Sequence, residues 1–202
     1  MNIELSEEEK IKILNSHDLF TVMQGILLRE QKTDQDREHF WTISLNNANQ
    51  LLAVELIGLG TVNSVAVKPM EVFSLPLQKR AVKLMLVHNH PSGQLKPSEA
   101  DLDITDNLIQ VGLILNVPVL DHMIISTESF YSFKDAGVLD KLVLSTKYVP
   151  HYRIKEMAIE GAKATMEKAT KLEMAKAFKE QGVDIKMIAT VTGVKQKERK
   201  EL

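Results

Sequence analysis

The sequence contains no cysteine among its 202 residues. This absence excludes disulfide bonds, thiol nucleophiles and zinc sites with thiolate ligands. It also favours a reducing cytoplasm as the location of the protein. No run of about 18 apolar residues occurs, so the sequence predicts neither a membrane-spanning helix nor a membrane partner. The N-terminal segment is mainly acidic and lacks the basic and apolar regions of a secretory signal.

Several motifs that mark common enzyme chemistries are also missing. The sequence has no Gly-x-Ser-x-Gly elbow, no phosphate-binding P-loop and no His-Glu-x-x-His pair. Gly58-Leu59-Gly60 lacks the third glycine of a dinucleotide-binding loop. A zinc deaminase would need cysteine ligands. The sequence therefore gives little support to serine-hydrolase, dinucleotide-binding or deaminase chemistry.

The composition is that of a globular protein, with 44% hydrophobic and 26% charged residues. The length suits one compact domain with a helical extension. Charge is distributed unevenly, because residues 1–146 carry 12 Lys and Arg against 19 Asp and Glu, whereas residues 147–202 carry 13 against 8. A basic tail on an acidic body suggests that the tail has its own partner or docks on a neighbouring chain. A solvated, lysine-rich helix is an equally weighted alternative.

Apolar periodicity and turn residues predict an α/β or α+β protein, with a sheet between helices. Helices are predicted at residues 6–15, 16–28, 71–83 and 98–111, the last ended by Gly112. Strands are predicted at residues 40–45, 51–57, 64–67, 84–87, 117–120, 123–126 and 130–133, the first two forming a hairpin. Two further helices are predicted at residues 151–181 and 185–191. We therefore expect an N-terminal helical segment at residues 1–31, a main domain at residues 32–146 and a basic helical tail at residues 147–202.

One segment combines residues that can bind a metal. An apolar strand leads into His88-Asn89-His90-Pro91, and residues at i and i+2 of a strand lie on the same face. Asp101 follows in the first turn of a predicted helix. Two imidazoles and one carboxylate are a ligand set for catalytic zinc with a fourth position left for water. Alternatively, Ser98-x-x-Asp101 only caps the helix, and each histidine is packed or exposed without a ligand role.

The spacing His-x-His-Pro, six residues, Ser, two residues, Asp resembles the metalloprotease signature of the JAB/MPN domain. The longer string from His88 to Gly93, followed by Pro97-Ser98-x-x-Asp101, is similar to the bacterial RadC branch. Supporting segments occur at residues 60–64, 69–73 and 121–125, and the resemblance covers residues 32–140. It implies an α/β fold with a mixed sheet flanked by helices, followed here by a C-terminal helical extension. It also implies that His88, His90 and Asp101 hold Zn²⁺.

The resemblance further implies roles in hydrolysis. The family pattern has a glutamate on an upstream strand that binds the water activated by the metal, and Glu55, 33 residues before His88, fits this position. Alternatively, Glu55 faces solvent on an alternating strand. Glu71 is a rival that the resemblance places at a helix start. Ser98 is expected to donate a hydrogen bond to the developing oxyanion. The implied reaction is cleavage of an amide or isopeptide bond in a peptide or protein substrate.

The sequence departs from the family pattern in three places. Met70 stands where the RadC branch usually has arginine. The helix-hairpin-helix region that usually precedes the domain is not recognisable in residues 1–31. The segment between Glu55 and His88 is too short for the insertions with which eukaryotic relatives hold ubiquitin. A ubiquitin substrate is therefore not expected.

Asp121-His122 has two interpretations. The pair could orient a metal ligand, or it could be structural near the start of a strand. The resemblance gives it no ligand role, so we leave it outside the predicted site. No partners are identifiable for the remaining histidines, His17, His39 and His151.

The tail suggests a second class of function. Phe178, Gly182 and Ile188 have the spacing of a helix-turn-helix unit, and the basic residues Lys195 to Lys200 follow. This pattern predicts contact with DNA, and a helical hairpin for packing or self-association into a homo-oligomer is the alternative. The second hypothesis is therefore a DNA-associated accessory protein of a mobile element or of a defence or repair locus. Its metal site would be structural or weakly active.

Overall fold

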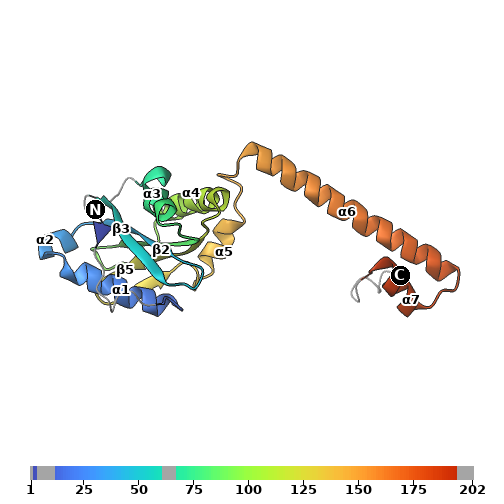
Figure 1. Cartoon of the computed structure of the whole chain (residues 1–202), viewed down its shortest axis with the longest axis horizontal. Helices are drawn as coiled ribbons and strands as arrows, with labels where there is room; N and C mark the ends of the chain where they lie inside the picture. Colours follow the sequence, from blue (N-terminus) through green and yellow to red (C-terminus); the bar gives the residue numbers. More distant parts are fainter. Residues whose placement is uncertain (1, 4–11, 61–66, 195–202) are drawn as a thin grey trace. The chain divides into compact units, whose positions relative to one another are not determined.

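The computed structural model describes residues 2–3, 12–60 and 67–194. The chain forms two compact units, Met1–Tyr148 and Val149–Leu202 (Figure 1). The helices of the first unit are α1 (Ser16–Arg29), α2 (Lys32–Gln35), α3 (Pro69–Gln78), α4 (Glu99–Leu115) and α5 (Val138–Val143). Its strands are β1 (Asn2–Ile3), β2 (His39–Leu45), β3 (Leu51–Leu59), β4 (Lys83–Asn89), β5 (Val119–Ile125) and β6 (Phe130–Ser132).

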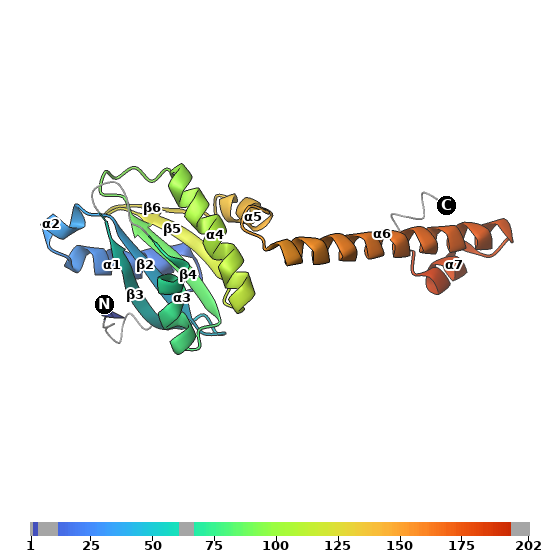
Figure 2. The same ribbon diagram turned by 90° about the horizontal axis from the view of Figure 1, so that it is seen from above.

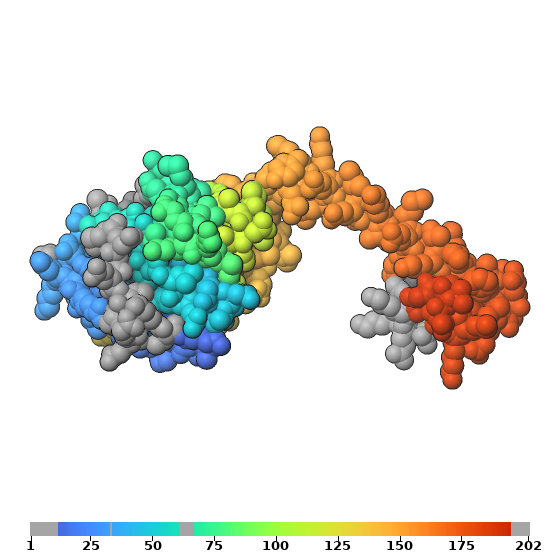
Figure 3. Space-filling model, in the orientation of Figure 1, coloured from blue at the N-terminus to red at the C-terminus, as the bar shows by residue number. Residues whose placement is uncertain are grey.

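The described strands form one mixed sheet in the order β1-β3-β2-β4-β5-β6. Strands β4 and β5 run parallel and are joined through α4, whereas the other neighbouring strands are antiparallel. Helices α3 and α4 cover one face of the sheet and α1 covers the other (Figure 2). The atoms of α3 and α4 adjoin on the surface shown in Figure 3. This is the mixed sheet flanked by helices that the sequence predicts.

Alternation along β4 explains how the sheet carries both a core and a site. Leu84 and Leu86 pack with α3 and α4, whereas Met85 and Val87 pack with α1 on the opposite face. Both sets are buried, which is typical of a central strand covered on two sides. His88 continues the series of Leu84 and Leu86. The same two-residue period therefore places its imidazole under α4.

Several predicted boundaries were wrong. Helix α3 ends at Gln78 instead of residue 83, and the single strand β5 replaces two short predicted strands. Helix α4 continues through Gly112 to Leu115, and its C-cap residue Asn116 has a φ of 56°. A Cβ atom on Gly112 would lie 2.6 Å from the carbonyl oxygen of Val117. The glycine therefore permits a close approach of two backbone segments instead of ending the helix.

The N-terminal part also differs from the expected helical segment. Strand β1 pairs with β3, and Lys12 forms an isolated bridge with Gln50. Most of the helix predicted at residues 6–15, and most of the strand predicted at residues 64–67, fall outside the described residues. Helix α1 forms where the second helix is predicted, and its Asn15 cap accepts a hydrogen bond from the backbone N–H of Asp18.

The second unit contains α6 (His151–Glu180) and α7 (Ile185–Thr192), close to the two predicted helices. Buried Ala175, Ile188 and Val194 form a small apolar cluster with Phe178 and Val183. The side chain of Asp184 caps α7. The predicted basic run at residues 195–200 lies outside the described residues. In the described part of the chain, no helix is both long and apolar enough to cross a lipid bilayer.

Candidate metal centre

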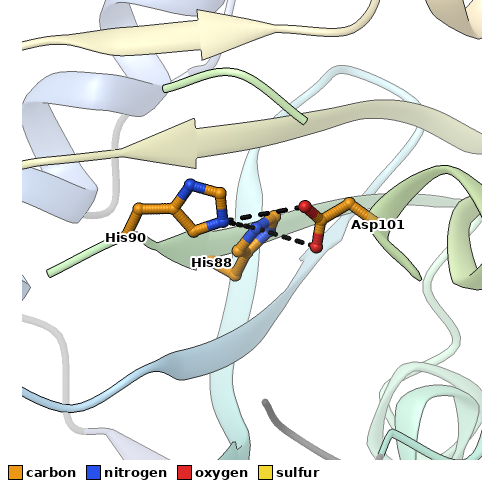
Figure 4. Close-up of side chains that lie close together, drawn as sticks. All are labelled: His88, His90 and Asp101. Atoms are coloured by element: carbon orange, nitrogen blue, oxygen red, sulfur yellow. Dashed lines mark hydrogen bonds and ion pairs between the residues drawn. The ribbon is translucent and has the colours of Figure 1, made fainter. Parts of the chain in front are cut away.

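The end of β4 and the first turn of α4 bring three metal-binding side chains together. His88 is on β4, His90 follows the strand directly, and Asp101 is on α4. Figure 4 shows the three side chains pointing toward one another. One potential ligand atom from each residue lies within 4.8 Å of the other two. The structure therefore assembles the group that the sequence predicts.

The distances in this group fit a metal ion. Nε2 of His88 lies 3.0 Å from Nε2 of His90 and 3.2 Å from Oδ1 of Asp101. Nε2 of His90 lies 3.6 Å from Oδ2 of Asp101. Ligand atoms at about 2.0–2.2 Å from a tetrahedral zinc ion are separated by about 3.3 Å. Both the donor types and their separations are therefore suitable for zinc.

The carboxylate of Asp101 is fixed by the start of its own helix. Its Oδ2 accepts hydrogen bonds from the backbone N–H of Ser98 at 2.7 Å and from the Ser98 hydroxyl at 2.6 Å. Oγ of Ser98 in turn accepts from the backbone N–H of Asp101 at 3.1 Å. This capping box and the facing histidines coexist, so the two interpretations of Asp101 are compatible. The Ser98 hydroxyl donates its hydrogen to Asp101. It could donate to an oxyanion only if this hydrogen bond to Asp101 were broken.

The ionisation of Asp101 and His88 favours metal binding, whereas that of His90 opposes it, because the hydrogen bond with Asp101 raises the pKa of His90. Burial would raise the pKa of Asp101, but the facing imidazoles of His88 and His90 hold that pKa well below its ordinary value. Burial lowers the pKa of His88, although Asp101 opposes this effect. Metal ligation requires an ionised carboxylate and a neutral imidazole. Asp101 and His88 are therefore both biased toward the required forms.

The group lies in a cavity of about 790 Å³. Glu38, Ser98 and Lys96 are among the polar residues that line it together with the three potential ligands. Burial raises the pKa of Glu38, while the charge of His90 lowers it and that of Asp101 raises it. The charges of His90 and Asp101 therefore both act on the Glu38 carboxylate.

The structure does not bring Glu55 to this group. Phe40 on β2 pairs with His88, whereas Glu55 on β3 pairs with Thr42. With strands about 4.8 Å apart and a rise of about 3.3 Å per residue, this register separates the Cα atoms of Glu55 and His88 by about 12 Å. Glu55 is not among the described residues that line the cavity. By this register Glu55 lies away from the three residues, whereas Glu38 lines the same cavity as they do.

Glu38 was missed because the signal for it is not local. It directly precedes β2, and β2 runs antiparallel to β4, so the start of β2 meets the end of β4. The sequence predicts the β2–β3 hairpin but does not show which of these strands pairs with β4. The available signal was that Glu38 directly precedes β2, a strand rich in aromatic and branched residues.

Asp121 and His122 separate onto opposite faces of the sheet. Nε2 of His122 lies 2.8 Å from Nδ1 of His88. Asp121 instead accepts hydrogen bonds from the hydroxyl of Ser132 at 2.6 Å and from the backbone N–H of Lys134 at 2.9 Å. Asp121 also accepts a hydrogen bond of 2.8 Å from the backbone N–H of His122, but only the His122 side chain contacts His88. Among the other histidines, His39 is buried and stacks on Trp41 with ring centroids 5.0 Å apart.

Comparison with known proteins agrees with this geometry. The model of the RadC-like JAB domain matches residues 13–138. A UPF0758 protein of Desulforamulus reducens is 45% identical over 113 residues, which are 56% of this chain and 50% of that protein. A UPF0758 protein of Chlorobium chlorochromatii is 37% identical over 134 residues, covering 66% and 58% of the two chains. The chain spans about half the length of the curated relatives it matches.

Proposed function

Because the chain belongs to the RadC-like JAB domain family, we propose that it is a zinc-dependent hydrolase that cleaves an amide or isopeptide bond in a peptide or protein. The convergence of His88, His90 and Asp101 in a cavity that also contains Glu38 is the observation that carries this proposal. When bound, zinc would supply a Lewis acid that polarises a carbonyl oxygen and lowers the pKa of water.

The remaining chemistry belongs to residues of the chain. Glu38 is the proposed general base, since burial moves its pKa upward toward the range where a carboxylate exchanges protons with water. It would take a proton from the attacking water and deliver it to the leaving amine. Ser98 keeps Asp101 oriented through its capping box. A donation from its hydroxyl to the substrate oxygen is the less favoured role, because Asp101 already holds that hydrogen.

A cleavage assay on a defined library tests the proposal. The full chain is loaded with one equivalent of zinc and incubated with peptides that include lysine-linked isopeptides, and the products are identified by mass spectrometry. Zinc-dependent cleavage that is lost in His90→Ala supports the function. Cleavage that persists after chelation, or in His90→Ala, would show a contaminating activity. No cleavage of any peptide by the zinc-loaded protein would contradict peptide hydrolysis.

A DNA-associated role is a second candidate, favoured by the tail. The α6–α7 hairpin is closed by the cluster around Ala175, and Gly182 supplies a positive φ of 75° at its turn. The tail carries 13 Lys and Arg against 8 Asp and Glu. DNA affinity that falls steeply with salt would support this role. Absence of DNA binding at low salt would contradict this role. The α6–α7 hairpin would then serve self-association, which analytical ultracentrifugation would detect.

A further inference from the structure

A chain of hydrogen bonds runs behind the proposed metal ligands. Nδ1 of His88 lies 2.8 Å from Nε2 of His122. Nδ1 of His122 lies 2.6 Å from Oγ1 of Thr105, and the Thr105 hydroxyl donates to the backbone carbonyl of Asp101. His122 and Thr105 are completely buried. The chain therefore joins two ligands, one on β4 and one on α4, through groups that water does not reach.

The position of each hydrogen in this chain follows from counting donors. Thr105 has one hydroxyl hydrogen, and the Asp101 carbonyl can only accept, so that hydrogen is used there. Oγ1 of Thr105 must then accept from Nδ1–H of His122. A neutral imidazole carries hydrogen on one nitrogen, so Nε2 of His122 is an acceptor. His88 consequently donates through Nδ1–H, and its Nε2 keeps a lone pair directed toward His90 and Asp101.

The opposite arrangement would disable the site. If Thr105 donated to His122, Nε2 of His122 would carry hydrogen and donate to His88. His88 would then hold its hydrogen on Nε2, which is the nitrogen that faces Asp101 at 3.2 Å. That tautomer cannot ligate a metal through Nε2. The bond from Thr105 to the carbonyl four residues earlier, a common arrangement in helices, decides between the two.

The surroundings keep His122 in one orientation. Its ring packs against Phe133 with centroids 4.8 Å apart and against Phe40 with centroids 5.5 Å apart. Neither neighbour offers a hydrogen-bonding group, and among the described residues the ring nitrogens bond only to His88 and Thr105. A rotated ring would leave both nitrogens unpaired in the core, which is costly.

We propose that His122, held by Thr105, is a positioning residue that fixes His88 in the tautomer whose Nε2 binds the metal. The inference rests on the proposed metal site but not on hydrolysis. Residues that support metal ligands typically contribute about 10- to 100-fold to metal affinity. His122 differs from the usual carboxylate or carbonyl partner because it is a neutral acceptor whose own tautomer is set by a helix hydroxyl.

A matched pair of substitutions at Thr105 tests this inference. Thr105→Val keeps the shape and removes the hydroxyl, whereas Thr105→Ser keeps the hydroxyl. Zinc affinity of the full chain is measured by competition with a chromogenic chelator. The tautomer of His88 in zinc-free protein is measured from its ring ¹⁵N chemical shifts. We expect Thr105→Val to bind zinc about 10- to 100-fold more weakly and to gain the Nε2–H tautomer of His88. Thr105→Ser should match the wild type in both measurements.

A second pair keeps the test decisive if Thr105→Val does not fold. His122→Gln retains an acceptor for Nδ1–H of His88, whereas His122→Leu does not, so only the leucine variant should lose affinity and the Nδ1–H tautomer. Equal zinc affinity and unchanged ¹⁵N shifts across either pair would overturn the inference. The wild-type shifts test it independently, because an Nε2–H tautomer in zinc-free wild type also overturns it. Failure of the wild type to bind zinc would instead contradict the proposed metal site.

Discussion

Oδ1 of Asn89 accepts a hydrogen bond of 2.7 Å from the backbone N–H of His39. Nδ2 of the same side chain donates to the backbone carbonyl of Arg37 at 3.0 Å. Asn89 lies between His88 and His90, the two proposed ligands, and the backbone groups that it binds flank Glu38 on both sides. One buried amide therefore ties the segment that carries the proposed base to the strand that carries the ligands.

The first prediction concerns this amide. Asn89→Ala removes both hydrogen bonds and leaves the buried His39 N–H without a partner, whereas the Arg37 carbonyl keeps its contact with Nδ1 of His39 at 2.9 Å. The free energy of unfolding should fall by about 2 kcal/mol, the usual penalty for unsatisfied buried polar groups. Zinc content should be unchanged because no ligand is removed. Urea denaturation and metal analysis measure the two effects. Exposed Asn47 is the matched control, and equal losses in Asn47→Ala and Asn89→Ala would contradict the role of the bridge.

The second prediction concerns metal content. Purified protein should carry close to one zinc per chain, and His88→Ala or Asp101→Asn should each remove most of it, because two remaining ligands rarely hold the ion. Asparagine keeps the size of Asp101 but loses the charge. His151→Ala, which changes an exposed histidine of the tail, is the control. Unchanged zinc in both ligand variants, measured by mass spectrometry of the metal, would refute the assignment.

The third prediction distinguishes two glutamates. Glu38→Gln should keep zinc and lose about 10²–10⁴-fold in hydrolysis, as expected for removal of a general base. Glu55→Gln should keep both zinc and activity, because its Cα lies about 12 Å from that of His88 by strand register. The same peptide assay measures both variants. The reverse result would restore the sequence-based assignment of Glu55, and zinc loss in Glu38→Gln would make Glu38 a ligand.

Sequence reasoning located the three proposed ligands because each depends on a local pattern. The two-residue period of a strand places His88 and His90, and a capping box places Asp101. Glu38 and His122 could not be found in the same way. Glu38 reaches the site because β2, and not β3, pairs with β4. His122 reaches it because β5 joins β4 in parallel, which sets His122 next to Leu86, two residues before His88. The pairing of β2 with β4 and the pairing of β5 with β4 join segments far apart in the sequence, and periodicity does not encode them.

The fourth prediction follows from the burial of Glu55. Burial raises the pKa of Glu55 above its ordinary value of 4.5, and its Oε2 has no hydrogen-bond partner among the described residues. An acid whose folded pKa is raised destabilises the folded state above that pKa and has no such effect below its unfolded pKa. Glu55→Gln should therefore be more stable than the wild type at pH 7, and the gain should disappear as the pH falls to about 4. Denaturation curves at both pH values measure this difference, and a constant gain would contradict it.

The last prediction concerns the two units. Residues 1–148 should fold and bind zinc without the tail, because the two large apolar clusters and all three proposed ligands belong to the first unit. The cluster around Ala175 belongs entirely to the second. Removing residues 149–202 should leave zinc affinity unchanged and abolish any salt-dependent DNA binding, since these residues carry 12 Lys and Arg against 8 Asp and Glu. Circular dichroism and zinc titration of the truncated chain test the first part, and a fluorescence titration with duplex DNA tests the second.

An unfolded truncated chain would place the tail within the core, and DNA binding retained by the truncated chain would move the DNA contact to the first unit.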